Sequence, residues 1–444
     1  MGGNPGAGVG DAAGGGDLTD RETLRKLLHL AAGLPAFTLG FLSWPAALAL
    51  TVGLLLFNLL VWPHLGGRSV WRQRERRRGA APGVMAYPAV LVVAVLLFRQ
   101  QLELVAATWA LLAFGDGAAA LVGGRLPLAR LPWNGAKSWG GSIGCWLVGW
   151  AASAAALLWT APARLDPWTV LSAACLGSLV AAAVESLPGT LDDNWMAPLL
   201  GAGVIAFLLS TPAPTTALTV RLLTWLGVSA LLAALTVRRG GLSGDGAIAA
   251  AIVGAALGAG LGWPGWALLT LFFVSGVVAS RTAEPAEGGG GRRGDQVLAN
   301  GGVGALTALL WVATGLPGFR LACLAAVTEA AVDTVSGEIG QRLGAPARLV
   351  TTRREVPPGT GGAVSWAGSG IGLGVAILFV AVARLWGLIS WGEAVVVAVA
   401  AVLGAGLDSW LGATLERSGR LDNQGVNLVS TASAALIAGC WRIL

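Results

Sequence analysis

Long apolar runs constrain this 444-residue chain more than any other feature. Hydrophobic residues make up 55% of it and charged residues only 12%. A membrane-spanning helix needs roughly 20 apolar residues, and by that measure we expect about 15 spans. The runs are rich in Leu, Ala and Val and do not alternate every two residues. They therefore predict an all-α, polytopic transmembrane helical bundle rather than a β-barrel.

The basic residues indicate how the chain lies in the membrane. The net charge of +6 would by itself also suit a protein that binds nucleic acid. Most Lys and Arg, however, fall in every second predicted loop, for example 68–78 and 125–137. This distribution is the positive-inside pattern. We therefore expect an integral, multi-pass membrane protein with cytoplasmic basic loops, whose partner is the bilayer and not nucleic acid.

A group of acidic and small residues occurs twice, about 220 residues apart. The first copy contains Asp116, the loop SWGGS at 138–142, Glu185 and Asp193-Asn194. The second copy contains Asp333, the loop SWAGS at 365–369, Asp408 and Asp422-Asn423. The repeat predicts two related halves, which we divide into a domain at 21–212 and a domain at 213–444. The Gly-rich residues 1–20 are expected to form a disordered tail.

The repeated acids suggest metal and phosphate chemistry. A carboxylate at membrane depth costs a few kcal/mol unless it is paired, hydrated or bound to a cation. Asp116 and Asp333 each stand at the cytoplasmic end of a predicted span. Helix packing with a structural hydrogen bond is the alternative, and the recurrence of the pattern argues against it. Acids on separate helices that converge on one basic mouth would suit Mg²⁺, which commonly bridges protein carboxylates and nucleotide phosphates.

Glycine-rich segments with nearby basic residues are candidates for phosphate binding. Glycines let the backbone wrap a phosphate, while Lys or Arg supplies positive charge. Lys137 precedes the first such loop, and Arg292 and Arg293 lie in a second one at 287–302, for which a flexible linker is the alternative. The Asp192–Asn194 stretch also has the composition of a plain turn. On the first predicted span, Arg25 and His29 share a helix face, and a functional role and a membrane anchor stay equally open.

Four motifs in the first half carry a family resemblance. RKLLHLAAG, FGDGAAALVGGR, KSWGGSIG and VESLPGTLDDN follow one another over about residues 20–210. In this order they resemble the phytol kinase and dolichol kinase family of polyprenol kinases. The resemblance implies phosphorylation of an isoprenoid alcohol, typically with CTP as donor.

The second half resembles a different family. Its motifs are GLSGDGAIAA, GRRGDQVLANGG, AVDTVSGEIG, PPGTGGAVSWAG, GAGLDSWLGATLE and LDNQGVN, over about residues 225–444. They are similar to the phytyl-phosphate kinase family, long catalogued as a membrane domain of unknown function. That resemblance implies conversion of a prenyl monophosphate to the diphosphate, and it also marks Glu338 and Asn427.

Pattern and resemblance together define the candidate residues. The catalytic candidates are Asp116, Lys137, Glu185, Asp333 and Asp408. The candidates for nucleotide or phosphate binding are Arg125, Lys137, Ser138, Gly141, Ser142, Arg292, Arg293, Asn300, Arg342, Thr360 and Ser365. The candidate ligands of Mg²⁺ are Asp116, Glu185, Asp193, Asp333, Asp408 and Asp422.

The predicted function is that of a bifunctional membrane kinase. It would convert a prenyl alcohol to the monophosphate and then to the diphosphate, with Mg²⁺ and CTP or another nucleoside triphosphate. The active sites would face the cytoplasm. One alternative is nucleotidyl transfer to a lipid phosphate, as in relatives of phosphatidate cytidylyltransferase. A transporter with duplicated bundles is another, and it would need the acids near mid-span.

Overall fold

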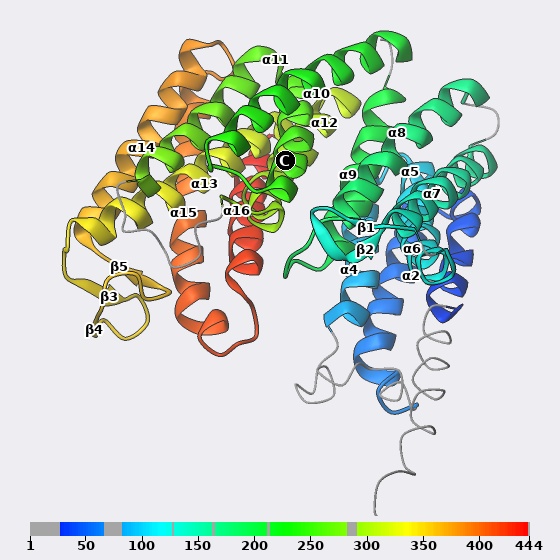
Figure 1. The fold of residues 1–444 in the computed structure, drawn as a ribbon, viewed down its shortest axis with the longest axis horizontal. Helices are drawn as coiled ribbons and strands as arrows, with labels where there is room; N and C mark the ends of the chain where they lie inside the picture. Colours follow the sequence, from blue (N-terminus) through cyan, green and yellow to red (C-terminus); the bar gives the residue numbers. More distant parts are fainter. Residues whose placement is uncertain are drawn as a thin grey trace, which may run out of the picture. The chain divides into compact units, whose positions relative to one another are not determined.

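The computed structural model describes residues 27–65, 82–126, 128–161, 165–210, 214–281 and 291–442. The expected disordered tail at 1–20, Arg25 and the basic loop at 68–78 lie outside these ranges. The described chain is almost entirely helical, with a few short strands (Figure 1). The prediction of an all-α polytopic bundle is therefore confirmed.

The described chain divides into two compact units. The first unit extends to Arg130 and resumes over Lys137–Ala182. Its elements are the 3-10 helix η1 (Leu34–Phe41), α2 (Trp44–Leu56), the π-helical η2 (Phe57–Val61), α4 (Pro82–Leu97), α5 (Leu102–Ala110), the π-helical η4 (Leu111–Gly115), α6 (Asp116–Arg125), α7 (Trp139–Thr160) and α8 (Pro167–Glu185) up to Ala182. Within it, α6 packs against the start of α7 at Gly123 and Gly141, where an added Cβ on Gly123 would lie 3.2 Å from the Gly141 Cα.

The second unit comprises residues 131–136 and 183–444. Its helices are α9 (Asp193–Leu208), α10 (Thr215–Arg238), α11 (Gly244–Arg281), α12 (Gly294–Thr314), α13 (Pro317–Arg342), α14 (Trp366–Leu385), α15 (Trp391–Leu411), the π-helical η5 (Gly412–Glu416) and α16 (Asn423–Cys440). Helix α13 is central, since it packs against α11, α12, α14, α15 and α16. Because neighbours surround it, its side chains from Phe319 to Val332 are nearly all buried.

Short strands complete the fold. In the second unit, β3 (Ala347–Leu349), β4 (Glu355–Val356) and β5 (Ala363–Val364) form an antiparallel sheet in the order β4-β3-β5. Ala347 pairs with Val356 and Leu349 pairs with Ala363. Strands β1 (Arg130–Leu131) and β2 (Asn134–Ser138) form a separate two-stranded sheet. Each sheet leads into a helix, α14 and α7 respectively, so the strands set where those helices begin.

Serine side chains cap the helices that follow these strands. Ser138 Oγ accepts a hydrogen bond from the Gly141 N–H at 3.2 Å, and Ser365 Oγ accepts one from Gly368 at 3.1 Å. In each case the serine occupies the N-cap in extended backbone and satisfies an N–H that the helix leaves unpaired. The two SWxGS segments thus form the same local structure, because a Ser-x-x-Gly sequence produces this cap at a helix start.

The predicted number of spans is wrong. Among the described residues, nine helices are long and apolar enough to cross a membrane. Three predicted spans are shorter apolar helices (Leu27–Phe41, Gly83–Leu97 and Asp193–Leu208). Two others, expected to start near Leu242 and Trp266, are both in α11, which bends at Gly262 with φ of 70°. Helices α13 and α16 are long enough but carry too many polar side chains.

The predicted pair of related halves is not supported. The second unit takes in Glu185 and Asp193, which the sequence pattern assigns to the first copy of the acidic group. Helix α9, which begins at Asp193, packs against α10 and α12 of that unit. Burial of apolar surface between helices is what decides the unit a segment joins, and here it crosses the expected repeat. The domain boundary between residues 212 and 213 stays a prediction.

Candidate functional site

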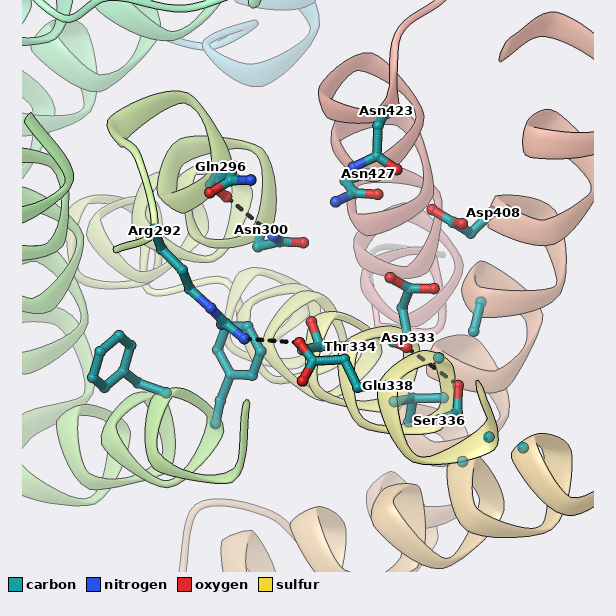
Figure 2. Close-up of a pocket in the computed structure, with 18 of the residues that line it drawn as sticks. Arg292, Gln296, Asn300, Asp333, Thr334, Ser336, Glu338, Asp408, Asn423 and Asn427 are labelled. Carbon is teal, nitrogen blue, oxygen red and sulfur yellow. Dashed lines mark hydrogen bonds and ion pairs between the residues drawn. The ribbon is translucent and has the colours of Figure 1, made fainter. Parts of the chain in front are cut away.

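A cavity of about 640 Å³ lies inside the second unit. Its wall is formed by α10 to α16 and by the glycine-rich segment 358–365. One side is polar, with side chains from α12, α13, α15 and α16 (Figure 2). Another side is apolar and includes Trp266, Leu269, Phe272 and Phe273 of α11. The volume is typical of small-molecule sites, and the divided wall suits an amphipathic ligand.

Two aspartates from separate helices point into the polar side. Asp333 comes from α13 and Asp408 from α15, and Figure 2 shows both carboxylates turned toward the same space, near Asn423 and Asn427 of α16. Asp408 Oδ2 accepts a hydrogen bond from Ser430 Oγ at 3.0 Å. When the Asn427 amide is oriented so that its nitrogen faces the acceptors around it, that nitrogen also donates to this Asp408 oxygen, at 3.3 Å. The structure thus places two of the acids that the sequence pattern singles out in one cavity, and their joint role stays a prediction.

Arg292 brings positive charge to the same cavity. Its guanidinium reaches Glu338 of α13 at 3.4 Å, and the two side chains are 22% and 27% exposed. Burial lowers the pKa of the Arg292 guanidinium from its ordinary value, although the Glu338 carboxylate acts in the opposite direction. The group remains cationic at neutral pH because the ordinary pKa of arginine lies far above neutrality. The guanidinium lies against Gly276 of α11, where an added Cβ would stand 2.5 Å from an Arg292 nitrogen.

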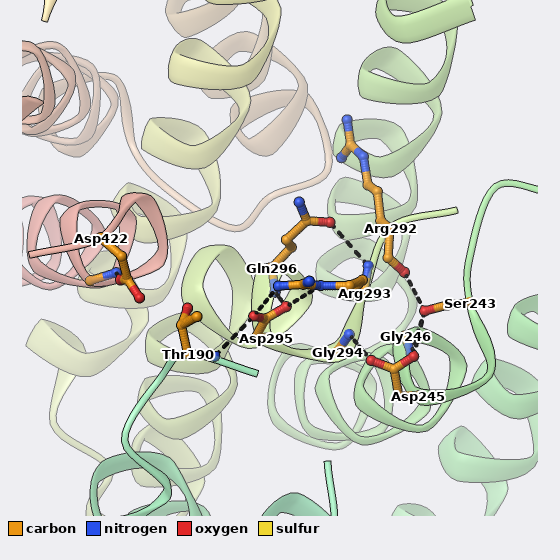
Figure 3. A network of polar contacts seen from close by, with 11 residues as sticks. Thr190, Ser243, Asp245, Gly246, Arg292, Arg293, Gly294, Asp295, Gln296 and Asp422 are labelled. Atoms are coloured by element: carbon orange, nitrogen blue, oxygen red, sulfur yellow. Dashed lines mark hydrogen bonds and ion pairs between the residues drawn. The ribbon is translucent and has the colours of Figure 1, made fainter. Parts of the chain in front are cut away.

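Hydrogen bonds fix the backbone of Arg292 (Figure 3). Its N–H donates to the Gly241 carbonyl at 3.1 Å, and its carbonyl accepts from the Ser243 N–H at 3.1 Å. Asp245, which is 6% exposed, accepts from Ser243 Oγ at 2.6 Å and from the Gly294 N–H at 2.7 Å. The start of α11 therefore holds the residues that precede α12. Because the backbone is held, the Arg292 side chain is directed into the cavity.

The neighbouring Arg293 forms an ion pair outside the cavity. Its guanidinium donates to Asp295 at 2.6 Å, and this contact raises the pKa of Arg293. Asp295 is only 2% exposed and also accepts from the Thr190 N–H at 3.2 Å. The loop before α9 thereby docks onto the start of α12, with Gly189 packed against the Asp295 side chain. Arg293 thus serves as the partner of a buried acid and does not line the cavity.

The other predicted residues of this unit have varied positions. Asn300, Thr360 and Ser365 line the cavity. Arg342 instead donates to the Ala279 carbonyl at 2.8 Å, near the end of α11. Asp422 is exposed and caps α16 by accepting from the Gly425 N–H at 2.8 Å. Glu185 is 8% exposed at the end of α8, and Asp193 begins α9, so both belong to this unit by packing.

Sequence reasoning missed a buried acid beneath the aspartates. Glu329 of α13 is 1% exposed, and its Oε1 atom has no hydrogen-bond partner among the described residues. It lies against Gly404 of α15, where an added Cβ would be 2.7 Å from the Glu329 Cγ. Its position four residues before Asp333 puts it on the same helix face, a signal that was present in the sequence. Gln296, one turn before Asn300, also lines the cavity and was missed.

The first unit contains a smaller polar contact around Asp116. His29 Nε2 lies 3.3 Å from Asp116 Oδ2 and 3.0 Å from the Leu112 carbonyl. The ring of Tyr87 packs edge-on against His29, with centroids 4.8 Å apart. Asp116 begins α6 directly after the π-helical η4, and Arg125 is exposed at the other end of α6. This contact brings His29 to a predicted catalytic acid that is distant in sequence.

The phosphate-binding candidates of the first unit cluster at the start of α7. Ser138 is 7% exposed and caps the helix, with Gly141 packed on α6. Lys137 is half-buried in β2. The Ser142 hydroxyl is buried and has no hydrogen-bond partner within the described chain. Gly123 follows Asp116 by seven positions in α6 and lies beside Ser138. At the rise of an α-helix, the acid and the serine cap are therefore about 10 Å apart along α6.

Metal binding by protein groups alone is not favoured. Within the residues that the structure describes, no group of three or more His, Cys, Asp or Glu side chains could hold a metal ion. Two facing carboxylates, Asp333 and Asp408, are nevertheless compatible with Mg²⁺. This ion usually takes only one or two carboxylates from a protein and completes its shell with water and substrate phosphates. The donor set therefore fits a magnesium ion that arrives with a nucleotide.

Comparison with known proteins gives the family. The family described as integral membrane protein DUF92 matches residues 227–435, which include the whole lining of the cavity. An uncharacterised membrane protein of Synechocystis is 32% identical over 203 residues, covering 42% of this chain and 77% of that protein. This chain belongs to the DUF92 family. It is accordingly an integral, multi-pass membrane protein.

Named relatives of this DUF92 chain include kinases. Phytol kinase 1 of Arabidopsis thaliana, a chloroplast protein, is 31% identical over 220 residues, covering 44% of this chain and 69% of that kinase. An uncharacterised membrane protein of Methanocaldococcus jannaschii is 31% identical over 206 residues, covering 44% of this chain and 84% of the relative. No solved structure matches. The family is thus distantly related to phytol kinases.

Proposed function

We propose that this protein is a membrane phosphotransferase that acts on isoprenoid lipids. In the second unit it converts a prenyl monophosphate to the diphosphate, and in the first unit it phosphorylates the prenyl alcohol. The donor is a nucleoside triphosphate, with CTP the first candidate, and both sites face the cytoplasm. The domains at 21–212 and 213–444 would carry the two activities. Similarity to phytol kinase 1 supports the kinase class of reaction.

One observation supports this function most strongly. The cavity of the second unit joins a half-buried cation, Arg292, and two facing acids, Asp333 and Asp408, to an apolar wall. A phosphorylated lipid has the matching division into a charged head and an apolar tail. A carrier of purely apolar lipid would gain nothing from an arginine and two acids in its cavity, because partly desolvating charged groups is costly.

The chemistry requires little from the protein beyond position and charge. A phosphate oxygen of the acceptor bonds to the γ-phosphorus of the nucleotide, and the bond from that phosphorus to the β–γ bridging oxygen breaks. The nucleoside diphosphate leaves with the electron pair. Arg292 holds phosphate oxygens by charge and hydrogen bonds, which is the usual role of a guanidinium. An ionised phosphate acceptor has no proton to lose, so this step needs no general base.

Asp333 and Asp408 are the residues that would hold Mg²⁺. When bound, that ion neutralises charge on the transferring phosphoryl group. The Asp408 carboxylate is oriented by α16, since Ser430 donates to it. Thr360 and Ser365, which also line the cavity, add hydroxyl groups. The two aspartates and these two hydroxyl groups would thus position both reacting phosphates.

The first unit has the group that an alcohol acceptor requires. A hydroxyl must lose its proton as its oxygen bonds to phosphorus. Asp116 can accept that proton, and His29 at 3.3 Å can orient the carboxylate and share the charge. Lys137 and the Ser138 cap would bind the donor phosphate at the start of α7. Glu185 and Asp193 stay proposed as acids that bind Mg²⁺, but they belong to the second unit and not to this site.

The test uses the full-length protein in liposomes with Mg²⁺ and geranylgeranyl monophosphate. CTP labelled on the γ-phosphate should transfer the label to lipid and release CDP. Label from the α-phosphate should stay in the nucleotide. Incorporation of α-label into lipid with release of pyrophosphate would instead identify a nucleotidyltransferase and overturn the proposal.

A variant links that activity to the cavity. Asp333→Asn should lower kcat by about 10²–10³, as expected when charge stabilisation at a transition state is removed. Glu355→Gln is the matched control, because Glu355 is 66% exposed and pairs with Arg348 on the sheet. Equal activity of Asp333→Asn and the wild type would exclude this cavity as the active site.

A further inference from the structure

The apolar end of the cavity is formed by an anchored tryptophan. Trp266 of α11 lines the cavity together with Ser229 and Ala233 of α10. Its indole N–H donates to Ser229 Oγ at 3.0 Å, and Ser229 is only 4% exposed. A buried hydroxyl that accepts an indole N–H restricts the rotation of the ring, since both groups would otherwise lose a hydrogen bond.

Packing within α10 and α11 holds the same ring. Trp225 of α10 lies with its ring centroid 5.8 Å from that of Trp266, at an angle of 35°. Gly254 of α11 gives space for this arrangement, because an added Cβ there would lie 2.5 Å from Ser229 Oγ and 3.6 Å from the Trp266 nitrogen. Gly258 gives space for the ring of Trp225 in the same way. The tryptophan wall is therefore rigid.

The wall lies at a definite distance from the charged end. Gly276, against which the Arg292 guanidinium lies, and Trp266 are on the same helical segment of α11, after the bend at Gly262. Ten residues separate them, which corresponds to about 15 Å along the helix. Leu269, Phe272 and Phe273 line the cavity between these positions. Along α11, the apolar side of the cavity therefore extends about 15 Å from the position of the cation to Trp266.

We propose that Trp266 is a specificity-determining residue that limits the length of the isoprenoid chain. The phosphate would lie at Arg292, the chain would follow the apolar side of α11, and its last isoprene unit would meet the indole. Chains longer than this limit would clash with a ring that Ser229 and Trp225 keep in place. This inference rests on the proposed function, because it assumes a prenyl phosphate in the cavity.

The experiment measures kcat/KM of the full-length protein for a series of prenyl monophosphates. The series contains the geranyl, farnesyl and geranylgeranyl compounds and one longer polyprenyl phosphate, each in liposomes with Mg²⁺ and CTP. Trp266→Ala should raise the ratio of kcat/KM for the longest acceptor over farnesyl phosphate by about 10-fold or more, because one methylene group in a fitted pocket already changes selectivity about 10-fold. Trp266→Phe should shift the ratio in the same direction by less.

Trp263→Ala is the matched control. Trp263 belongs to the same helical segment, but it is 58% exposed, packs on Trp386 at 5.2 Å and is not part of the cavity wall. Its variant should keep the wild-type ratio.

If Trp266→Ala folds and keeps that ratio too, the length limit is not set by Trp266, although the kinase function stands. If Trp266→Ala fails to fold, the ratio measured for Trp266→Phe decides in the same way. If the wild type phosphorylates none of the series, the proposed function itself fails, and the length limit with it.

Discussion

At the scale of single residues, the cavity depends on how a buried cation is accommodated. Arg292 lies among helices, with its guanidinium beside Gly276. It forms an ion pair with Glu338 at 3.4 Å. Taking a charge out of water is costly unless it is paired and hydrogen-bonded. A phosphate bound at Arg292 would add a second compensating anion. Substrate binding would therefore also stabilise the charge of this side chain.

Gly276→Ala should weaken phosphate binding without unfolding the protein. The added methyl group would stand 2.5 Å from an Arg292 nitrogen, and a long, flexible side chain can move away from it. We expect KM for the prenyl monophosphate to rise about 10-fold, equivalent to about 1.4 kcal/mol. Steady-state kinetics in liposomes would measure it.

Gly370→Ala is the control for this change. Gly370 is in α14, and nothing lies within 4 Å of an added Cβ. Its variant should therefore keep the wild-type KM. An unchanged KM in Gly276→Ala, with the protein folded, would mean that the position of the Arg292 guanidinium does not matter for substrate binding.

At the scale of elements, the starts of α11 and α12 form one unit. Asp245 at the start of α11 accepts from the Gly294 N–H at the start of α12, and Ser243 holds the carbonyl of Arg292 between them. Both Asp245 and Gly294 are buried. The four N–H groups at a helix start have no partner within the helix. Here a carboxylate of a neighbouring helix satisfies one of them.

Asp245→Ala should destabilise this junction. It leaves the buried Gly294 N–H without its acceptor, which costs about 1–3 kcal/mol. Asp245→Asn keeps an oxygen for that N–H and should recover most of the stability. Thermal unfolding of the purified protein in detergent would give the difference, with Glu355→Ala on the exposed sheet as a reference. Equal midpoints for Asp245→Ala and the reference would contradict a structural role for this contact.

At the scale of the whole molecule, the two units offer two chemically different polar sites. The first has a histidine beside an acid, and the second has two acids and a buried arginine. Under the proposed function, that difference would correspond to an acceptor hydroxyl, which must lose a proton, and an acceptor phosphate, which need not. The proposed order of reactions follows from this contrast.

Asp116→Asn and Asp333→Asn should therefore interrupt different steps. With a prenyl alcohol as substrate, Asp116→Asn should form no monophosphate, yet it should still convert added monophosphate to diphosphate. Asp333→Asn should accumulate monophosphate from the alcohol. Chromatography of the labelled lipids would separate these products. Loss of both reactions in each folded variant would contradict a division of labour between the units.

The sequence by itself determined the helical, membrane-embedded character of this protein. Apolar runs of sufficient length must form helices in a bilayer, since every backbone polar group has to be satisfied internally. The serine caps before α7 and α14 were not predicted, although each of them involves only neighbouring residues. Asp333 and Asp408 could be chosen from the sequence, since acids are rare in apolar segments.

Only the tertiary structure decided which of the candidates meet. Arg292, Asp333 and Asp408 come from distant segments and line one cavity, whereas Arg293, adjacent to Arg292, pairs with buried Asp295. The number of spans was overestimated because two predicted apolar runs form the single helix α11, three others form shorter helices, and α13 and α16 carry too many polar side chains. Burial of Glu329 likewise depends on neighbours supplied by α15 and α16. Local sequence sets helices and caps through near contacts, but the packing of distant helices sets which charges share a desolvated space.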